Sequence, residues 1–141
     1  MTIMQNSLFN RIKIDIERAY YISDRYNATS AFALLYHEKE LSPSELGTII
    51  RISDIFIKID ENHYFINFVH TNHTQAFKAA QNLLHALDSH FNDNSSAIAI
   101  DTFDVKQPAN LVINRLEQIL KEVKKNPYNR IDDENILNEI I

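Results

Sequence analysis

Two short clusters of polar residues hold the side chains that could bind a ligand or carry out chemistry. The first, Arg51-Ile52-Ser53-Asp54, sets a guanidinium three residues before a carboxylate. Arginine can hold a phosphate through two parallel hydrogen bonds, and aspartate can accept hydrogen bonds from N–H groups of a ligand. Arg51 and Asp54 are therefore a candidate ligand pair. The simpler alternative is that Arg51 pairs with a nearby carboxylate and Asp54 only begins a strand.

The second cluster, Asp60-Glu61-Asn62-His63-Tyr64, stands between two stretches of alternating apolar residues, as the turn of a β-hairpin does. A turn that binds phosphate brings its backbone close to the ligand, which usually requires glycine, and this turn has none. Asp60 and Glu61 add bulk and negative charge instead. Asp and Asn form turns readily because their side chains mimic backbone hydrogen bonds. We therefore interpret residues 60–64 as an ordinary hairpin turn.

The six histidines raise the question of a metal site. His70 and His73, with His63 or His37, are the best set, but they span a strand end and a helix start, so their spacing fixes no geometry. Histidines at the surface and at strand ends are the simpler account. No serine stands on a recognisable strained turn of the kind that hydrolases use. We expect no catalytic residue, no metal and no cofactor.

The pattern of apolar residues predicts helices and strands without repeats or linkers. Ser42-Pro43-Ser44-Glu45 is a capping box with proline at the first helical position, and Asn72 with Gln75 can cap a later helix. Residues 29–37 are apolar on both faces, which is typical of a central strand. The expected elements are a helix at 8–26, a strand at 29–37, a short helix from 43 to about 50, hairpin strands at 54–59 and 64–69, a helix after Asn72, a strand at 97–105, and a helix opened by Pro108 and ended by Asn126-Pro127.

This order of elements predicts an α/β (α+β) fold with one mostly antiparallel sheet of four to five strands and helices packed on it. We assign residues 1–131 to the domain and residues 132–141 to a C-terminal tail that could add one short helix. The four basic residues between Lys121 and Arg130 are interpreted as the solvated end of the last helix, where cations are favourable.

The composition excludes several classes of protein. A chain of 141 residues suits one domain, and a net charge of −5 disfavours a broad nucleic-acid surface. The absence of cysteine removes disulfides and thiolate catalysis. The first residues do not have the pattern of a signal peptide, and no apolar run is long enough for a membrane span. We expect a soluble, cytoplasmic, bacterial protein.

The order of elements and four motifs resemble the GGDEF domain of the diguanylate cyclase family, over about residues 8–129. Members of this family share a palm-like fold with class III nucleotide cyclases. In the family, a strand of the form R-x-x-D-x-x-x-R-x leads into the signature G-G-D/E-E-F. Here Arg51 and Asp54 begin that strand, Lys58 takes the second basic position, and residues 60–64 fall at the signature. The other three matches are Thr71 with Ala76 and Ala80 in the next helix, residues 97–101 at the family strand S-I-G-I-A, and residues 123–129 at the closing A-K-x-x-G-x-N.

The departures from the family pattern imply a lost activity. The family's glycines let the backbone approach the nucleotide phosphates, and they are Asp60 and Glu61 here. The third signature position, an acidic metal ligand in the family, is Asn62, and the fourth, normally Glu, is His63. The family's other metal carboxylates form a D-x-D-x-F-K pattern after the first strand, where this chain offers Glu38 alone. One carboxylate beside an acidic turn is a poor basis for two-metal phosphoryl transfer.

The resemblance therefore implies a degenerate GGDEF-like domain that is not an enzyme and acts as a signalling or protein-interaction module. The alternative is a cyclic di-GMP receptor, because R-x-x-D five residues before the signature is the family's inhibitory site and Arg51 and Asp54 have that spacing. A residual nucleotide-handling enzyme is the third reading. Expected partners are a protein or a second copy of the chain, or cyclic di-GMP, but neither nucleic acid nor a membrane.

One further expectation concerns the surface. The segment between His37 and Arg51 is too short to rebuild the family's substrate loop and its full second helix. A helix of about two turns spans roughly 11 Å, too little to shield a four-stranded sheet. We therefore expect exposed apolar surface beside residues 29–37, which would mark a contact site. The tail at 132–141 could cover it, from its own chain or from a second copy in a homodimer.

Overall fold

A computed structural model describes residues 6–27, 29–50, 54–69, 71–102, 107–126 and 128–139. In chain order the elements are α1 (Asn6–Tyr26), β1 (Ser30–Tyr36), α2 (Pro43–Ile49), β2 (Ile55–Lys58), β3 (His63–Val69), α3 (His73–Phe91), β4 (Ala97–Asp101), α4 (Ala109–Lys124), β5 (Ile131–Asp133) and α5 (Ile136–Glu139). Among the described residues, no helix is both long and apolar enough to cross a membrane.

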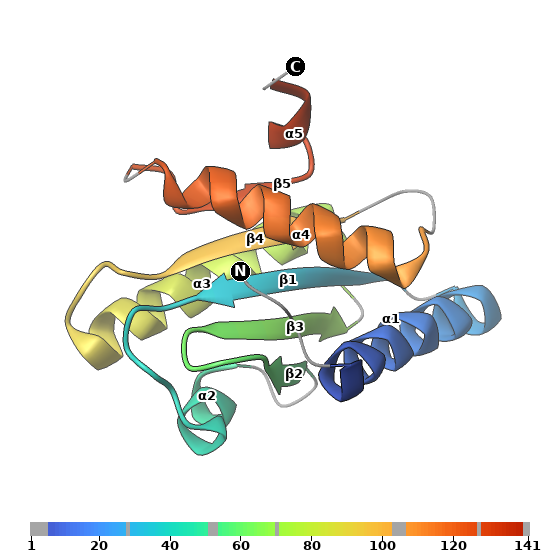
Figure 1. The fold of residues 1–141 in the computed structure, drawn as a ribbon, viewed down its shortest axis with the longest axis horizontal. Coiled ribbons are helices and arrows are strands. Elements are labelled where there is room, and N and C mark those ends of the chain that lie inside the picture. Colours follow the sequence, from blue (N-terminus) through green and yellow to red (C-terminus); the bar gives the residue numbers. More distant parts are fainter. Residues whose placement is uncertain are drawn as a thin grey trace.

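The strands form one sheet in the order β2-β3-β1-β4-β5 (Figure 1). β1 pairs antiparallel with both β3 and β4, β2 pairs antiparallel with β3, and β5 pairs parallel with β4. The predicted fold class, one mostly antiparallel sheet with helices packed on it, is confirmed. β1 is a central strand, as its two apolar faces predicted.

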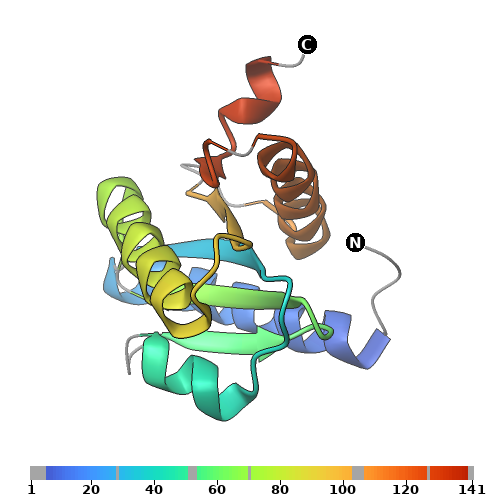
Figure 2. The same cartoon turned by 90° about the vertical axis from the view of Figure 1, so that its left-hand side faces the viewer.

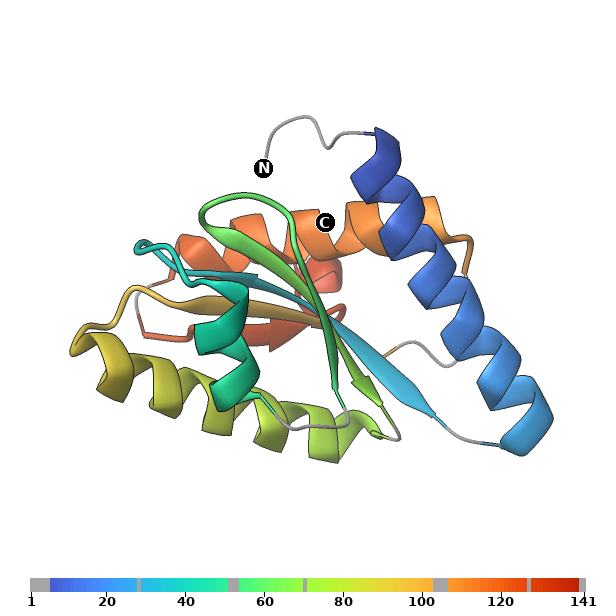
Figure 3. The same ribbon diagram turned by 90° about the horizontal axis from the view of Figure 1, so that it is seen from below.

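Helices cover both faces of the sheet (Figures 2 and 3). α1 and α4 bury one face, where Phe32 and Leu34 of β1 join their core. α2 and α3 bury the other face, where Ala33 and Leu35 join a second core. This alternation follows from the strand period of two residues. Eight apolar residues from six elements are buried between the layers, namely Phe32, Leu34, Ile57, Ile66, Leu83, Ile98, Ile100 and Leu116.

Local capping signals place α2 and α3. Ser42 and Glu45 form the predicted capping box, with Pro43 at the first helical position. Asn72 and Gln75 form the second box. α3 extends to Phe91, and Asn92 ends the helix in the left-handed conformation that Asn tolerates. The strand predicted at 97–105 ends at Asp101, and residues 103–106 lie outside the described residues.

The expected exposed surface beside β1 is not found. Residues 31–35 are each at most 2% exposed. The expectation was wrong because it counted only the length of α2. α3 has 19 residues and lies along the same face, while Leu41 and Leu46 fill the space next to it.

The tail contributes a strand that the sequence did not reveal. β5 crosses the boundary that we drew between residues 131 and 132, and its Asp133 pairs with Ile100 of β4. Beyond β5, the Glu134 carboxylate accepts hydrogen bonds from the backbone N–H and the hydroxyl of Thr102 at 3.1 and 3.0 Å. Ile136 and Leu137 then pack against the core between the sheet and α4. Within one chain, the tail therefore extends the β4 edge of the sheet.

We predict that deletion of residues 132–141 destabilises the protein, because it removes β5 pairing and the apolar contacts of α5. A loss of about 2 kcal/mol should lower the melting temperature by roughly 6 °C in a chain of this size. Thermal melting and light scattering of the truncated and full chains test this. An unchanged melting point and an unchanged mass would contradict it, whereas a halved mass would place the tail in a homodimer.

Candidate functional site

The cluster at residues 60–64 forms a hairpin turn that is closed by its own hydrogen bonds. The backbone N–H groups of Ile59 and Asp60 both donate to the carbonyl of His63, at 2.9 and 3.3 Å. The Asp60 carboxylate accepts from the backbone N–H of Asn62 at 2.8 Å and bonds His63 Nδ1 at 2.8 Å. Burial alone would raise the pKa of Asp60, but the hydrogen bonds from Asn62 and His63 outweigh it and lower this pKa below its ordinary value. Asp60 is therefore used within the turn.

Asn62 ties this turn to the end of β1. Its side-chain amide donates to the carbonyl oxygens of His37 and Glu38, at 3.0 and 2.9 Å. Its own carbonyl accepts the backbone N–H of His37 at 2.9 Å. Both amide hydrogens of Asn62 thus have partners, so the turn and the β1 end are held together without any other group between them.

Tyr64, on the opposite face of the sheet, attaches the hairpin to the loop between β1 and α2. It is fully buried, its hydroxyl accepts the Leu41 N–H at 2.7 Å, and it lies 3.1 Å from the Leu41 carbonyl. Glu38, which directly follows His37 at this end of β1, is exposed. Within the described ranges, no group of three or more His, Asp or Glu side chains is placed to hold a metal ion.

The candidate ligand pair is described only in part. Arg51 lies outside the described residues. Asp54 is 9% exposed, and its Oδ1 accepts the backbone N–H of Val69 at 3.3 Å. A cavity of about 80 Å³ adjoins it, lined by Ile49, Ile50, Asp54, Phe68, Ala79, Asn82 and Leu83. Asp54 thus has a structural role at the end of the hairpin, and little space opens beside it.

The candidate metal ligands do not converge. His70 lies outside the described residues. His73 Nε2 lies 2.6 Å from the Asp133 carboxylate, which joins α3 to β5, and His63 bonds Asp60. His37 faces α3 and stacks on Phe91 with ring centroids 4.3 Å apart.

The surroundings of His37 are a cluster that sequence reasoning missed. His37 is fully buried, its Nδ1 lies 2.5 Å from the Ser96 hydroxyl, and its Nε2 lies 3.6 Å from the Asp93 carboxylate. Burial lowers the pKa of His37, and the nearby Asp93 offsets this only in part. The three residue types are those of a hydrolase triad, but Ser96 is only 1% exposed and 3.6 Å is too long for a hydrogen bond. The cluster therefore anchors the loop before β4 to β1. Nothing local in the sequence could have revealed it, because His37 and Ser96 are 59 positions apart.

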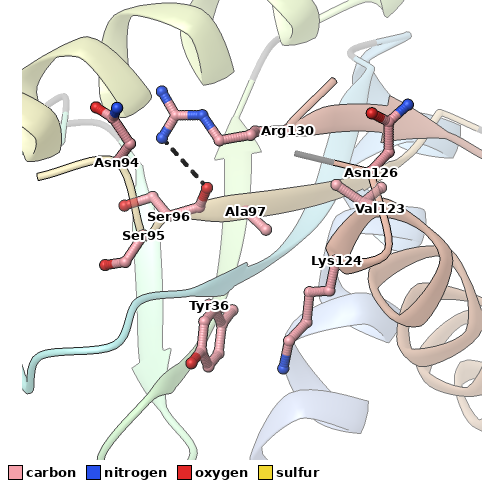
Figure 4. A pocket seen from close by; sticks show the side chains of 9 residues that line it. All are labelled: Tyr36, Asn94, Ser95, Ser96, Ala97, Val123, Lys124, Asn126 and Arg130. Atoms are coloured by element: carbon pink, nitrogen blue, oxygen red, sulfur yellow. Dashed lines mark hydrogen bonds between the residues drawn. The ribbon is translucent and has the colours of Figure 1, made fainter. Parts of the chain in front are cut away.

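Two depressions flank the end of β1 on the α4 side. One, of about 250 Å³, lies between His63 and the last turns of α4, lined by His63, Glu117, Leu120, Lys121, Lys124 and Lys125. The other, of about 480 Å³, lies between α4 and the loop before β4 (Figure 4). Lys124 borders both.

Comparison with known proteins finds likeness in structure and none in sequence. No family model and no curated protein sequence matches this chain. The diguanylate cyclase SiaD from Pseudomonas aeruginosa, solved in complex with its activator SiaC, matches with a TM-score of 0.68 at 9% identity, over 88% of this chain. This chain spans 57% of the length of SiaD.

The GGDEF domain of DgcB from Caulobacter crescentus, solved in complex with c-di-GMP, matches with a TM-score of 0.69 at 9% identity. The alignment covers 96% of this chain and 98% of the DgcB domain. At such low identity the likeness establishes the fold, and both structures carry the fold that the sequence resemblance implied. The chain therefore has a GGDEF-like fold.

Proposed function

We propose that this chain is a non-catalytic GGDEF-like signalling module that acts through contacts with a protein. The observation that carries this proposal is the position of the Asn62 amide between the carbonyl oxygens of His37 and Glu38. The sequence resemblance implies a metal-binding carboxylate at this position. The chain has a neutral hydrogen-bond donor there instead.

The chemistry of the two groups explains why this difference matters. A carboxylate at position 62 would face two carbonyl oxygens, and since all of these are acceptors, a cation would have to lie between them. The amide supplies two N–H groups and satisfies both carbonyls directly. The turn is thereby complete without a cation. Asp60 and Glu61 stand where the family has glycine, so the backbone is also less accessible to phosphate.

The two structural neighbours suggest what such a module could bind. SiaD was solved with an activator protein, and the DgcB domain with c-di-GMP. The first observation supports a protein partner for this chain. The second, with the spacing of Arg51 and Asp54, supports the alternative of a cyclic di-GMP receptor. The burial of Asp54 and its bond to Val69 favour the protein partner, because a ligand would have to compete for this carboxylate.

We predict that the purified protein makes no cyclic di-GMP from GTP and magnesium. The measurement is chromatographic detection of product under conditions in which an active diguanylate cyclase serves as the positive control. Steady product formation that Asn62→Ala or His63→Ala abolishes would refute the proposal.

The role of the Asn62 amide can be tested by stability. Asn62→Asp should lower the free energy of unfolding in metal-free buffer by about 1–3 kcal/mol, because the partly buried His37 carbonyl and the exposed Glu38 carbonyl lose their donors and face a carboxylate. Asn10→Asp makes the same change at an exposed position of α1 and should have little effect. Equal stability of Asn62→Asp and the wild type in urea unfolding would show that the amide bridge is unimportant.

The alternative function, a cyclic di-GMP receptor, can be tested by titration calorimetry. We predict no saturable binding of cyclic di-GMP, because the Asp54 carboxylate already accepts a hydrogen bond from Val69. Arg51→Ala and the exposed Arg11→Ala would serve as a matched pair. Micromolar binding that Arg51→Ala removes and Arg11→Ala leaves intact would establish the receptor instead.

A further inference from the structure

The face of the sheet under α1 holds two polar side chains that none of the functions above uses. α1 packs against β1, β3 and α4, and most residues in this contact are apolar (Figure 3). Asp15 of α1 and Asn67 of β3 lie within it and are only 5% and 3% exposed. The Asn67 side chain hydrogen-bonds the Asp15 carboxyl group, so a polar contact joins the helix to the strand inside an apolar layer.

The position of Asp15 makes an ionised carboxylate costly. Ile12 and Ile16 lie on the same buried side of α1. A buried carboxylate without a cationic partner tends to take up a proton, because its charge has lost its hydration. Burial accordingly raises the pKa of Asp15, and the hydrogen bond from Asn67 and the charge of Arg18 offset this only in part.

Two oxygen atoms of this pair need a donor. In the described part of the chain, Asp15 Oδ2 and Asn67 Oδ1 are buried, and neither accepts a hydrogen bond from a protein group. When Asp15 is ionised, both atoms are acceptors and cannot bond each other. A proton on Asp15 Oδ2 turns the carboxyl group into a donor. A carboxylic acid and a primary amide can then join through two parallel hydrogen bonds, one N–H to O and one O–H to O.

The same requirement applies if the Asn67 amide turns over. Its oxygen would then face the carboxyl group, and only a protonated Asp15 could donate to it. In both orientations, the pair is complete when Asp15 is neutral and incomplete when Asp15 is charged.

On the helices, the neighbouring polar groups have other partners or lie in water. Arg18 is exposed, so water weakens its attraction for a buried carboxylate. The Tyr20 hydroxyl donates to the Gln107 carbonyl at 2.8 Å. On α4, Arg115 lies 3.5 Å from the Asp101 carboxylate of β4. Neither arginine is therefore in position to neutralise the buried carboxyl group of α1.

The strands under α1 add no charge beside Asp15. β1 contains no charged residue. On β3, His63 stands four residues before Asn67 and bonds Asp60 in the hairpin turn. Asn67 is therefore the neighbour in the sheet that favours one form of the carboxyl group over the other.

We propose that Asp15 and Asn67 form a pH-sensitive contact that holds α1 on the sheet more firmly when Asp15 is protonated. In the protonated form, the amide donates to one carboxyl oxygen and the carboxylic O–H donates to the amide oxygen. Release of the proton to water removes the second hydrogen bond and leaves two buried acceptors near each other. The attachment of the N-terminal helix then weakens. This inference concerns α1 alone and does not depend on the function proposed for the chain.

The direction of the pH effect follows from the raised pKa of Asp15. The folded chain keeps this proton at pH values where the unfolded chain has already released it. The stabilisation is therefore fully present below the ordinary Asp pKa of about 3.9, and it is lost as the pH rises through the folded-state pKa.

The test is urea unfolding of the wild type, Asp15→Asn and Glu17→Gln over a range from about pH 4 to about pH 8. Asparagine at position 15 has a carbonyl oxygen and an NH₂ group in the places of the C=O and O–H of a protonated acid, so it keeps both hydrogen bonds at every pH. The folding equilibrium constant of Asp15→Asn relative to the wild type should therefore rise with pH, by up to about tenfold per pH unit until the pKa of Asp15 is passed. Glu17→Gln removes an exposed carboxylate from the same helix, and its ratio to the wild type should change less than about twofold.

Two NMR measurements locate the effect. In the wild type, the carbon-13 shift of the Asp15 carboxyl group should titrate above the ordinary Asp pKa. Hydrogen-exchange protection of α1 should fall relative to that of α4 as the pH rises, and Asp15→Asn should abolish this fall. The carboxyl titration needs no substitution, so it decides the matter even if Asp15→Asn does not fold.

Three results would overturn the inference. The first is a ratio of Asp15→Asn to wild type that does not change with pH, which would mean that the ionised carboxylate is equally well satisfied, for example by a trapped water molecule. The second is a carboxyl titration at or below the ordinary Asp value. The third is an equal loss of protection in α1 and α4, which would show that the pair does not act on α1 in particular.

Discussion

The arrangement of this molecule depends on β1, which is paired on both edges and buried on both faces. β3 and β4 satisfy its backbone groups, and residues 31–35 are almost inaccessible to solvent. A strand that is closed on all four sides can present functional groups only at its ends. At the C-terminal end of β1, successive side chains point to opposite faces of the sheet, so Tyr36 packs on the α4 side and His37 packs on the α3 side. The hairpin turn, the loop before β4 and the end of α4 meet these two residues.

At that meeting point the hairpin turn of this GGDEF-like fold is held by side chains of the turn itself. The turn at 60–64 closes on itself through Asp60 and on β1 through Asn62. On the opposite face, Tyr64 holds the loop that leads into α2. Asp60, Asn62 and Tyr64 each hydrogen-bond within the chain, and these contacts hold the hairpin to the β1 end. Asp60 and Asn62 are thus the two residues whose side chains close the turn.

The sequence predicted the features that local chemistry determines. Ser42 with Glu45 and Asn72 with Gln75 define helix starts within four residues, and the apolar alternation of the hairpin defines its strands. It did not predict β5, because three residues reading Ile-Asp-Asp have no strand pattern and become a strand only by pairing with β4. The contacts of His37 with Ser96 and Asp93 were missed for the same reason, since the sheet brings together residues that are far apart in the chain. The exposed face expected beside β1 was wrong because cover depends on α3 and on Leu41, not on the length of α2 alone.

The distribution of charge at the end of β1 follows from the same geometry. Lysines in the last turns of α4 are favoured by the helix dipole wherever that helix ends, so their presence alone indicates no ligand. What distinguishes Lys124 is the side chain beneath it. Tyr36 offers a ring where the resemblance implies a strand end rich in metal carboxylates, and the ring holds the ammonium without neutralising it. Neither Tyr36 nor Asn62 carries a charge, and of the two lysines at the end of α4, Lys125 pairs with Glu122 whereas Lys124 lies over the Tyr36 ring. The ring at position 36 therefore fixes where the Lys124 ammonium group lies without changing its charge.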